Sequence, residues 1–177
     1  MASTLVRQVT GSSVAKKNRD IQTMTKFKLA AALLIVSASS AFADDYSLTS
    51  SVTVTADSAT VWQAVGDFCD VDDWHPGIVS CVLEARDGAV HRQLTLGDGA
   101  PVLEQLVSEV AGQSYTYKIV EAPLPITDYV STLSVTLGNP TTVTWAGTFK
   151  SDVPEMEGAI QGLYDGGLGA ISTRFSE

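Results

Sequence analysis

Cysteine, histidine and positive charge are all scarce in this sequence. Its 177 residues contain 2 Cys, 2 His, and 11 Lys and Arg against 20 Asp and Glu. A metal bound by both cysteines would need further ligands, and only His75 and His91 are available, so we expect no metal site and no cofactor. The apolar run over residues 29–36 is far shorter than the ~20 residues that a membrane-spanning helix needs.

The N-terminal part of the chain is typical of a secretory signal peptide. Lys26 and Lys28 precede the apolar run 29–36, and small residues then lead to Ala41-Phe42-Ala43. A basic head, a short apolar stretch and an A-x-A site are the features that signal peptidase recognises. The sequence therefore predicts export to the periplasm or outside the cell, with a retained membrane anchor as the alternative.

Removal of residues 1–43 would leave a strongly acidic domain over residues 44–177. We expect translation to start at Met24, which opens the leader. The remaining domain carries 5 Lys and Arg against 19 Asp and Glu, a formal net charge of −14. Because such a polyanion repels phosphate backbones and anionic lipid, we expect no nucleic acid partner and no stable membrane insertion. A basic protein would be a suitable partner.

The two cysteines form an even pair, which in an exported protein indicates a disulfide first. Cys69 and Cys81 are twelve residues apart and would join the end of a helix to a strand. A redox pair is disfavoured because the sequence has no C-x-x-C motif.

The hydrophobic pattern predicts a single α+β domain. Residues 48–55 alternate as a strand, a short helix follows the N-cap candidate Asp57, and a long amphipathic helix begins near Pro154. Between the helices the period is two, which predicts strands over residues 78–86, 89–96, 100–110, 113–121, 128–137 and 142–150. This order implies a curved antiparallel sheet that wraps the C-terminal helix.

One predicted hairpin carries a charge pair toward the interior. If Asp98 is the tip of the turn Gly97-Asp98-Gly99, Arg92 faces Glu104 on an otherwise apolar face, which extends to the pair Val90 and Leu106. Burial of two charges costs several kcal/mol, and their attraction only roughly offsets it. The pair is either a structural ion bridge or the polar end of a ligand cavity.

The following hairpins would add aromatic residues to the same face. A turn at Ala111-Gly112 pairs Ser108 with Tyr115 and Leu106 with Tyr117. A turn centred on Asn139 pairs Leu133 with Trp145 and Tyr129 with Phe149. Each aromatic taken singly is typical of ordinary core, but three buried phenols need hydrogen-bond partners, which favours a hydrated pocket.

These residues also carry a resemblance to a known family. The ordered set comprises Val61-Trp62, Gly66-Asp67-Phe68, Trp74-His75-Pro76, Cys81, Arg92, Asp98-Gly99, Glu104, Tyr115-x-Tyr117, Pro123-Leu124-Pro125, Asp128-Tyr129 and Trp145. It resembles an exported member of the bacterial polyketide cyclase/dehydrase-like branch of the START/Bet v 1 (SRPBCC) superfamily, over about residues 48–170. The resemblance implies a helix-grip fold: a seven-stranded antiparallel sheet around a long C-terminal helix, with a hydrophobic cavity between them.

Plant abscisic-acid receptors resemble the chain more distantly. The resemblance places their gate loop at Gly97–Pro101, their latch at Pro123–Ile126 and their pocket glutamate at Glu104. The latch tripeptide of those receptors is absent, so their hormone-responsive partner switch is not expected here.

Three functions are consistent with these observations. The first is binding of a small apolar or amphipathic ligand, including a lipid, by Arg92, Glu104 and nearby aromatic residues. The complete set of predicted ligand-binding residues is Trp74, His75, Arg92, Glu104, Tyr115, Tyr117, Tyr129 and Trp145.

The second function is a polyketide cyclase or dehydratase, in which Arg92 would stabilise an enolate and Glu104 or a tyrosine would move protons. An ionised Glu104 beside Arg92 would be a weak base, and we assign no catalytic residue. His75 is either a base at the cavity mouth or a structural residue packed beside Trp74. The third function is that of a periplasmic accessory protein of an oxidation system, since similar periplasmic members are encoded alongside methanol oxidation systems.

Overall fold

The computed structural model describes residues 43–138 and 140–176. The predicted signal peptide, its start at Met24 and nearly all of its cleavage motif lie outside these residues and remain predictions. No helix within the described ranges is both long enough and apolar enough to cross a membrane.

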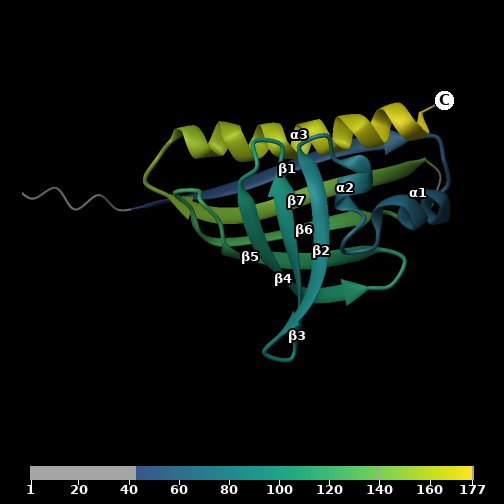
Figure 1. Cartoon of the computed structure of the whole chain (residues 1–177). Coiled ribbons are helices and arrows are strands. Elements are labelled where there is room, and N and C mark those ends of the chain that lie inside the picture. The colour runs from purple at the N-terminus through teal and green to yellow at the C-terminus, as the bar shows by residue number, and fades with distance from the viewer. Residues whose placement is uncertain (1–42, 139, 177) are drawn as a thin grey trace, which may run out of the picture. The chain divides into compact units, whose positions relative to one another are not determined.

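The described residues form a seven-stranded antiparallel sheet with three helices (Figure 1). The strands are β1 (Asp44–Val54), β2 (Ile78–Arg86), β3 (Ala89–Leu96), β4 (Pro101–Val110), β5 (Ser114–Glu121), β6 (Thr127–Val135) and β7 (Thr141–Ser151). The sheet order is β1-β7-β6-β5-β4-β3-β2, so each strand from β2 to β7 pairs with its neighbour in sequence and β1 closes onto β7. The predicted helix-grip fold is confirmed.

The helices are α1 (Ser58–Val65), α2 (Val71–Trp74) and α3 (Glu155–Phe175). Asp57 caps α1, because its side chain accepts the Thr60 N–H at 2.9 Å, as the sequence predicted. The short helix α2 lies between α1 and β2. Pro154 occupies the N-cap position of α3.

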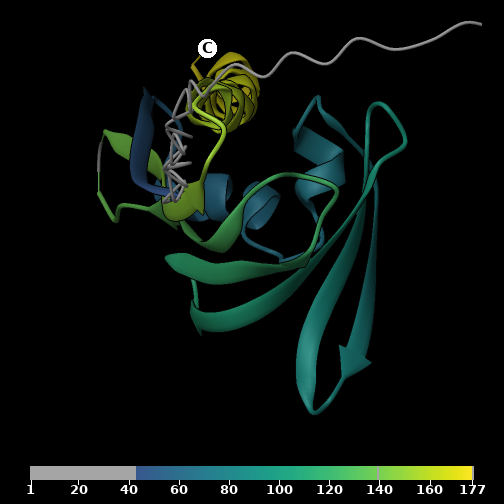
Figure 2. The same cartoon turned by 90° about the vertical axis from the view of Figure 1, so that its left-hand side faces the viewer.

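The sheet curls so that α3 lies across its open side, seen end-on in Figure 2. The face of α3 turned toward the sheet is apolar, and its buried residues include Ile160, Tyr164, Leu168 and Ile171. These side chains join the inward residues of the strands in one hydrophobic core. The spacing that predicted the amphipathic helix therefore also identified the face that packs on the sheet.

The predicted strand register is correct for three of the six named pairs, including Leu106 with Tyr117, and wrong for the other three. Arg92 pairs with Glu104, and Leu133 pairs with Trp145 as expected. The β3–β4 ladder ends at His91, however, and Val90 is 45% exposed, so its predicted pairing with Leu106 is wrong.

Two further expected pairs are replaced through bulges. A register shift between Leu106 and Ser108 places Thr116, not Tyr115, opposite Ser108. A second shift at the start of β6, where Asp128 has a φ of 53°, removes Tyr129 from the ladder. An extra residue in one strand breaks the alternation on which a register prediction depends.

Candidate ligand-binding cavity

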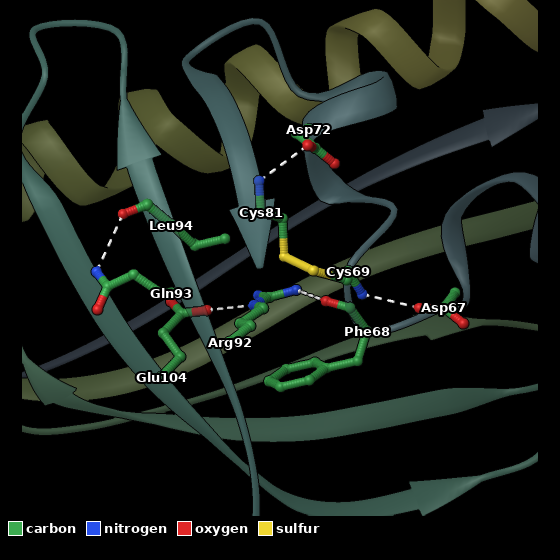
Figure 3. The surroundings of a disulfide bond; sticks show 9 residues. All are labelled: Asp67, Phe68, Cys69, Asp72, Cys81, Arg92, Gln93, Leu94 and Glu104. Atoms are coloured by element: carbon green, nitrogen blue, oxygen red, sulfur yellow. Dashed lines mark hydrogen bonds and ion pairs between the residues drawn. A yellow bond between two sulfur atoms is a disulfide. The ribbon is translucent and has the colours of Figure 1, made fainter. Parts of the chain in front are cut away.

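Arg92 and Glu104 form a buried ion pair between the facing strands β3 and β4 (Figure 3). Arg92 Nε donates to Glu104 Oε2 at 2.6 Å. Arg92 Nη1 also donates to the backbone carbonyl of Phe68, in the segment between α1 and α2. The pair therefore joins the sheet to the helical segment that covers it.

Aromatic rings surround the guanidinium of this pair. The Arg92 Cζ lies 4.2 Å from the centroid of the Phe68 ring and 4.8 Å from that of Tyr117. Tyr115 is more distant, at 5.7 Å. Contacts of a cation with ring faces are favourable when the cation is desolvated, which helps to offset the cost of burying Arg92.

Burial and mutual attraction shift the pKa values of Arg92 and Glu104 in opposite directions. Burial alone would lower the pKa of Arg92, but the Glu104 carboxylate raises it above its usual value, so the guanidinium remains charged. Burial raises the pKa of Glu104, and the attraction of Arg92 opposes that rise without cancelling it.

A chain of hydrogen bonds runs from the sheet to α3 beside the pair. Trp145 Nε1 lies 3.0 Å from the Tyr117 hydroxyl, which is 3.4 Å from that of Tyr129. The Tyr129 hydroxyl is 2.9 Å from Tyr164, and Tyr164 is 3.0 Å from Ser131 Oγ. The phenols thus bond to one another, whereas the sequence had favoured water as their partner.

The direction of this chain is determined by its last member. Ser131 donates its single hydroxyl proton to the Ala146 carbonyl at 3.0 Å. Each hydroxyl has only one proton, so Tyr164 donates to Ser131, Tyr129 donates to Tyr164, and Tyr117 donates to Tyr129. Burial also raises the pKa values of Tyr117 and Tyr129 well above 10.0, so neither phenol is a base at neutral pH.

His75 is held as a neutral imidazole. Gly77 N–H donates to Nδ1 at 3.0 Å, so Nδ1 is the acceptor and Nε2 carries the proton that is donated to the Leu163 carbonyl at 3.0 Å. Burial lowers the pKa of His75 below 6.5. With both ring nitrogens bonded, His75 connects the segment before β2 to α3 and has no free nitrogen for proton transfer.

A cavity of about 50 Å³ lies between the sheet and α3. Its polar lining groups are His75, Arg92, Glu104, Tyr117, Tyr129 and Trp145, and its apolar lining is Val71, Ile78, Leu94, Leu96, Val102, Ile119, Leu124, Ile160 and Leu163. A single water needs roughly 10–15 Å³ by this measure, so the cavity has room for a few waters or a few non-hydrogen atoms. It is several-fold smaller than the ~300–1,000 Å³ pockets of drug-sized ligands.

Six of the eight predicted ligand-binding residues line this cavity, and two do not. Trp74 packs edge-on against Trp145, with ring centroids 5.8 Å apart, and lies behind the lining. Tyr115 packs against Trp62 and Phe68, with ring centroids 6.3 and 5.7 Å away, and is not part of the lining.

Two parts of the site were not predicted from the sequence. The hydrogen bonds that join Tyr164, on α3, to Tyr129 and Ser131 of the sheet were not expected. Phe68 was part of the family resemblance, yet its backbone contact with Arg92 could not be read from side-chain patterns.

The disulfide expected between Cys69 and Cys81 is present and holds the segment that carries Phe68 (Figure 3). Asp67 accepts the Cys69 N–H, and Asp72 accepts the Cys81 N–H, both at 2.9 Å. The disulfide follows Phe68 directly in the chain, so it restrains the carbonyl that Arg92 contacts.

Within the described ranges, no group of three or more His, Cys, Asp or Glu side chains could hold a metal ion. The arrangement instead provides an apolar hollow with an ion pair and a hydroxyl chain on its wall. Its chemistry is that of recognition by shape and by a small number of hydrogen bonds.

The fold and the cavity define a helix-grip protein of the START/Bet v 1 type. The family described as "Polyketide cyclase / dehydrase and lipid transport" matches residues 46–176. The chain belongs to this family, which supports a ligand-binding or cyclase role and suggests that the ligand is small and hydrophobic. No curated protein matches the chain.

Solved structures agree with this assignment. The protein XoxI from Bacillus cereus is 33% identical, with a TM-score of 0.67 over 73% of this chain and 94% of that one. A Bacillus thuringiensis protein is 34% identical, with the same TM-score over 73% of this chain and 98% of that one. The di-domain ARO/CYC StfQ from the steffimycin biosynthetic pathway, at 11% identity and a TM-score of 0.59 over 73% of this chain and 50% of that one, shares the fold.

Proposed function

We propose that this protein binds a small apolar or amphipathic molecule between its sheet and α3, outside the cytoplasm. The observation that carries the proposal is the buried Arg92–Glu104 pair on the wall of an apolar cavity. A buried ion pair beside an unfilled volume adds little to the stability of a core, because the desolvation of the two charges costs about as much free energy as their attraction returns. The pair is therefore better explained by ligand binding than by stability.

The size of the cavity limits the ligand. In this conformation it holds a few non-hydrogen atoms, either a whole small molecule or the head group of a larger one. A longer ligand requires α3 to move away from the sheet, since Ile160 and Leu163 of α3 line the cavity. The disulfide supports the exported location, since disulfides persist in oxidising compartments.

The test is to purify the full-length gene product from its source organism and compare native with denaturing mass spectra. A released small molecule is the expected result. Val102→Leu and Val102→Phe fill the cavity and should reduce the captured amount, whereas Val107→Phe, on the same strand but 53% exposed, should not.

Two other outcomes would contradict the proposal and support a different function. A protein that carries no small molecule but copurifies with a basic protein would indicate the accessory role. Turnover of a β-keto compound that is lost in Arg92→Met would indicate the cyclase or dehydratase.

A further inference from the structure

The cavity wall offers very few hydrogen-bond donors to a ligand. Trp145 uses its only N–H on Tyr117, and His75 uses its Nε2–H on the Leu163 carbonyl. Tyr117 and Tyr129 use their protons along the directed hydroxyl chain. Toward the cavity, these side chains present oxygen lone pairs and ring faces rather than protons.

The ion pair also offers the cavity a hydrogen-bond acceptor rather than a donor. Glu104 bonds Arg92 through Oε2, which leaves Oε1 without a hydrogen bond among the described residues. The Arg92 side chain is 1% exposed and the Glu104 side chain 7%. Phe68 and Tyr117 also lie against the guanidinium. The accessible charge of the pair is therefore a carboxylate oxygen, which accepts hydrogen bonds strongly.

We infer that the cavity selects a ligand with a neutral hydroxyl or N–H group, which donates to Glu104 Oε1. This inference rests on the proposed ligand-binding function and narrows it. A ketone, aldehyde or ether of the same shape would leave the carboxylate oxygen without a partner. An acceptor without a hydrogen bond in an apolar cavity costs free energy. The cavity should therefore distinguish ligands of equal size by their polar group.

Probes that fit the cavity provide the test. 2-Propanol and acetone have the same carbon skeleton and differ in the hydrogen-bond donor, and xenon reports whether the cavity accepts any guest. Binding would be followed by amide and methyl chemical shifts of Leu94 and Val102 in the full-length protein. We expect 2-propanol to bind about tenfold more tightly than acetone, the effect of one hydrogen bond to a charged acceptor.

Glu104→Gln provides a second measurement. The glutamine oxygen would accept from Arg92 Nε–H, which turns the amide NH₂ toward the cavity and converts the accessible atom from acceptor to donor. The preference should then shift from 2-propanol to acetone. Glu109→Gln, on the exposed outer part of the same strand, is the matched control and should keep the original preference.

The outcomes separate the two proposals. Binding of xenon with equal or tighter binding of acetone in the unaltered protein would overturn the donor inference and leave the ligand-binding function standing. Absence of any shift with xenon and both probes would overturn the ligand-binding function itself. If Glu104→Gln fails to fold, the comparison of 2-propanol with acetone in the unaltered protein still tests the donor inference.

Discussion

Gly167 of α3 lies directly against the imidazole ring of His75. A Cβ at position 167 would be 2.5 Å from His75 Cδ2, 2.9 Å from Trp145 Cζ3 and 3.0 Å from Trp74 Cζ3. The rings of His75, Trp74 and Trp145 contact one another edge-on, so none can move without displacing the others. Gly167 thus allows α3 to approach the cavity closely.

Gly167→Ala should destabilise the protein by about 1–3 kcal/mol, the usual cost of overpacking a core. Gly166→Ala is the matched control, since a Cβ there has no neighbour within 4 Å. It should stabilise the helix by up to ~1 kcal/mol, because alanine favours helix more than glycine does. Urea denaturation of both variants measures the effect. Equal stability of Gly167→Ala and the unaltered protein would contradict the role assigned to this contact.

The sequence predicted the Arg92–Glu104 pair because a short turn and a strict period of two leave one possible register. The same reasoning failed at Ser108 and Tyr129, where bulges add a residue that hydrophobicity does not mark. The bond between Tyr129 and Tyr164 joins distant parts of the chain and depends on the rotation of α3 about its axis. The cavity volume is a small difference between large packed volumes, so no pattern of residue types could reveal it.

Arg92→Met should cost about 3–5 kcal/mol in the free energy of unfolding, because it leaves the Glu104 carboxylate buried without a partner. The loss should be smaller at pH 5 than at pH 7.5, since a protonated Glu104 is cheaper to bury. Denaturant titrations at the two pH values provide the measurement. Arg92→Met combined with Glu104→Leu should recover most of the stability, because an apolar pair needs no counter-charge. A loss in Arg92→Met that is the same at both pH values would contradict this account.

His75 should also make the stability of the protein depend on pH. Its pKa in the folded protein is below 6.5 because of burial, whereas the unfolded chain has the ordinary value. The unfolded state therefore takes up the proton first as the pH falls. The stabilisation is fully present above pH 6.5 and is lost as the pH decreases toward the folded-state pKa.

The change that isolates this effect is His75→Gln. The difference in unfolding free energy between the unaltered protein and the variant should be larger at pH 7.5 than at pH 5.5. Taking this difference at each pH cancels the contributions of the other titrating groups, which the two proteins share. A constant difference across this range would show that the histidine does not remain neutral in the fold. The ¹⁵N shifts of the ring offer a direct check, with Nε2 protonated and Nδ1 not.

Tyr164→Phe should destabilise the protein by about 1–3 kcal/mol, because it removes an acceptor from Tyr129 and a donor from Ser131 at once. Ser131→Ala interrupts the same chain one step later, so the double variant should cost less than the two single changes added together. Tyr46→Phe is the control: Tyr46 stacks on Phe149 with ring centroids 5.0 Å apart, a contact that phenylalanine preserves. Additive losses at Tyr164 and Ser131 would mean that the two hydroxyls act separately. The directed chain would then no longer explain why the hydroxyl protons of Tyr117 and Tyr129 are not available to a ligand in the cavity.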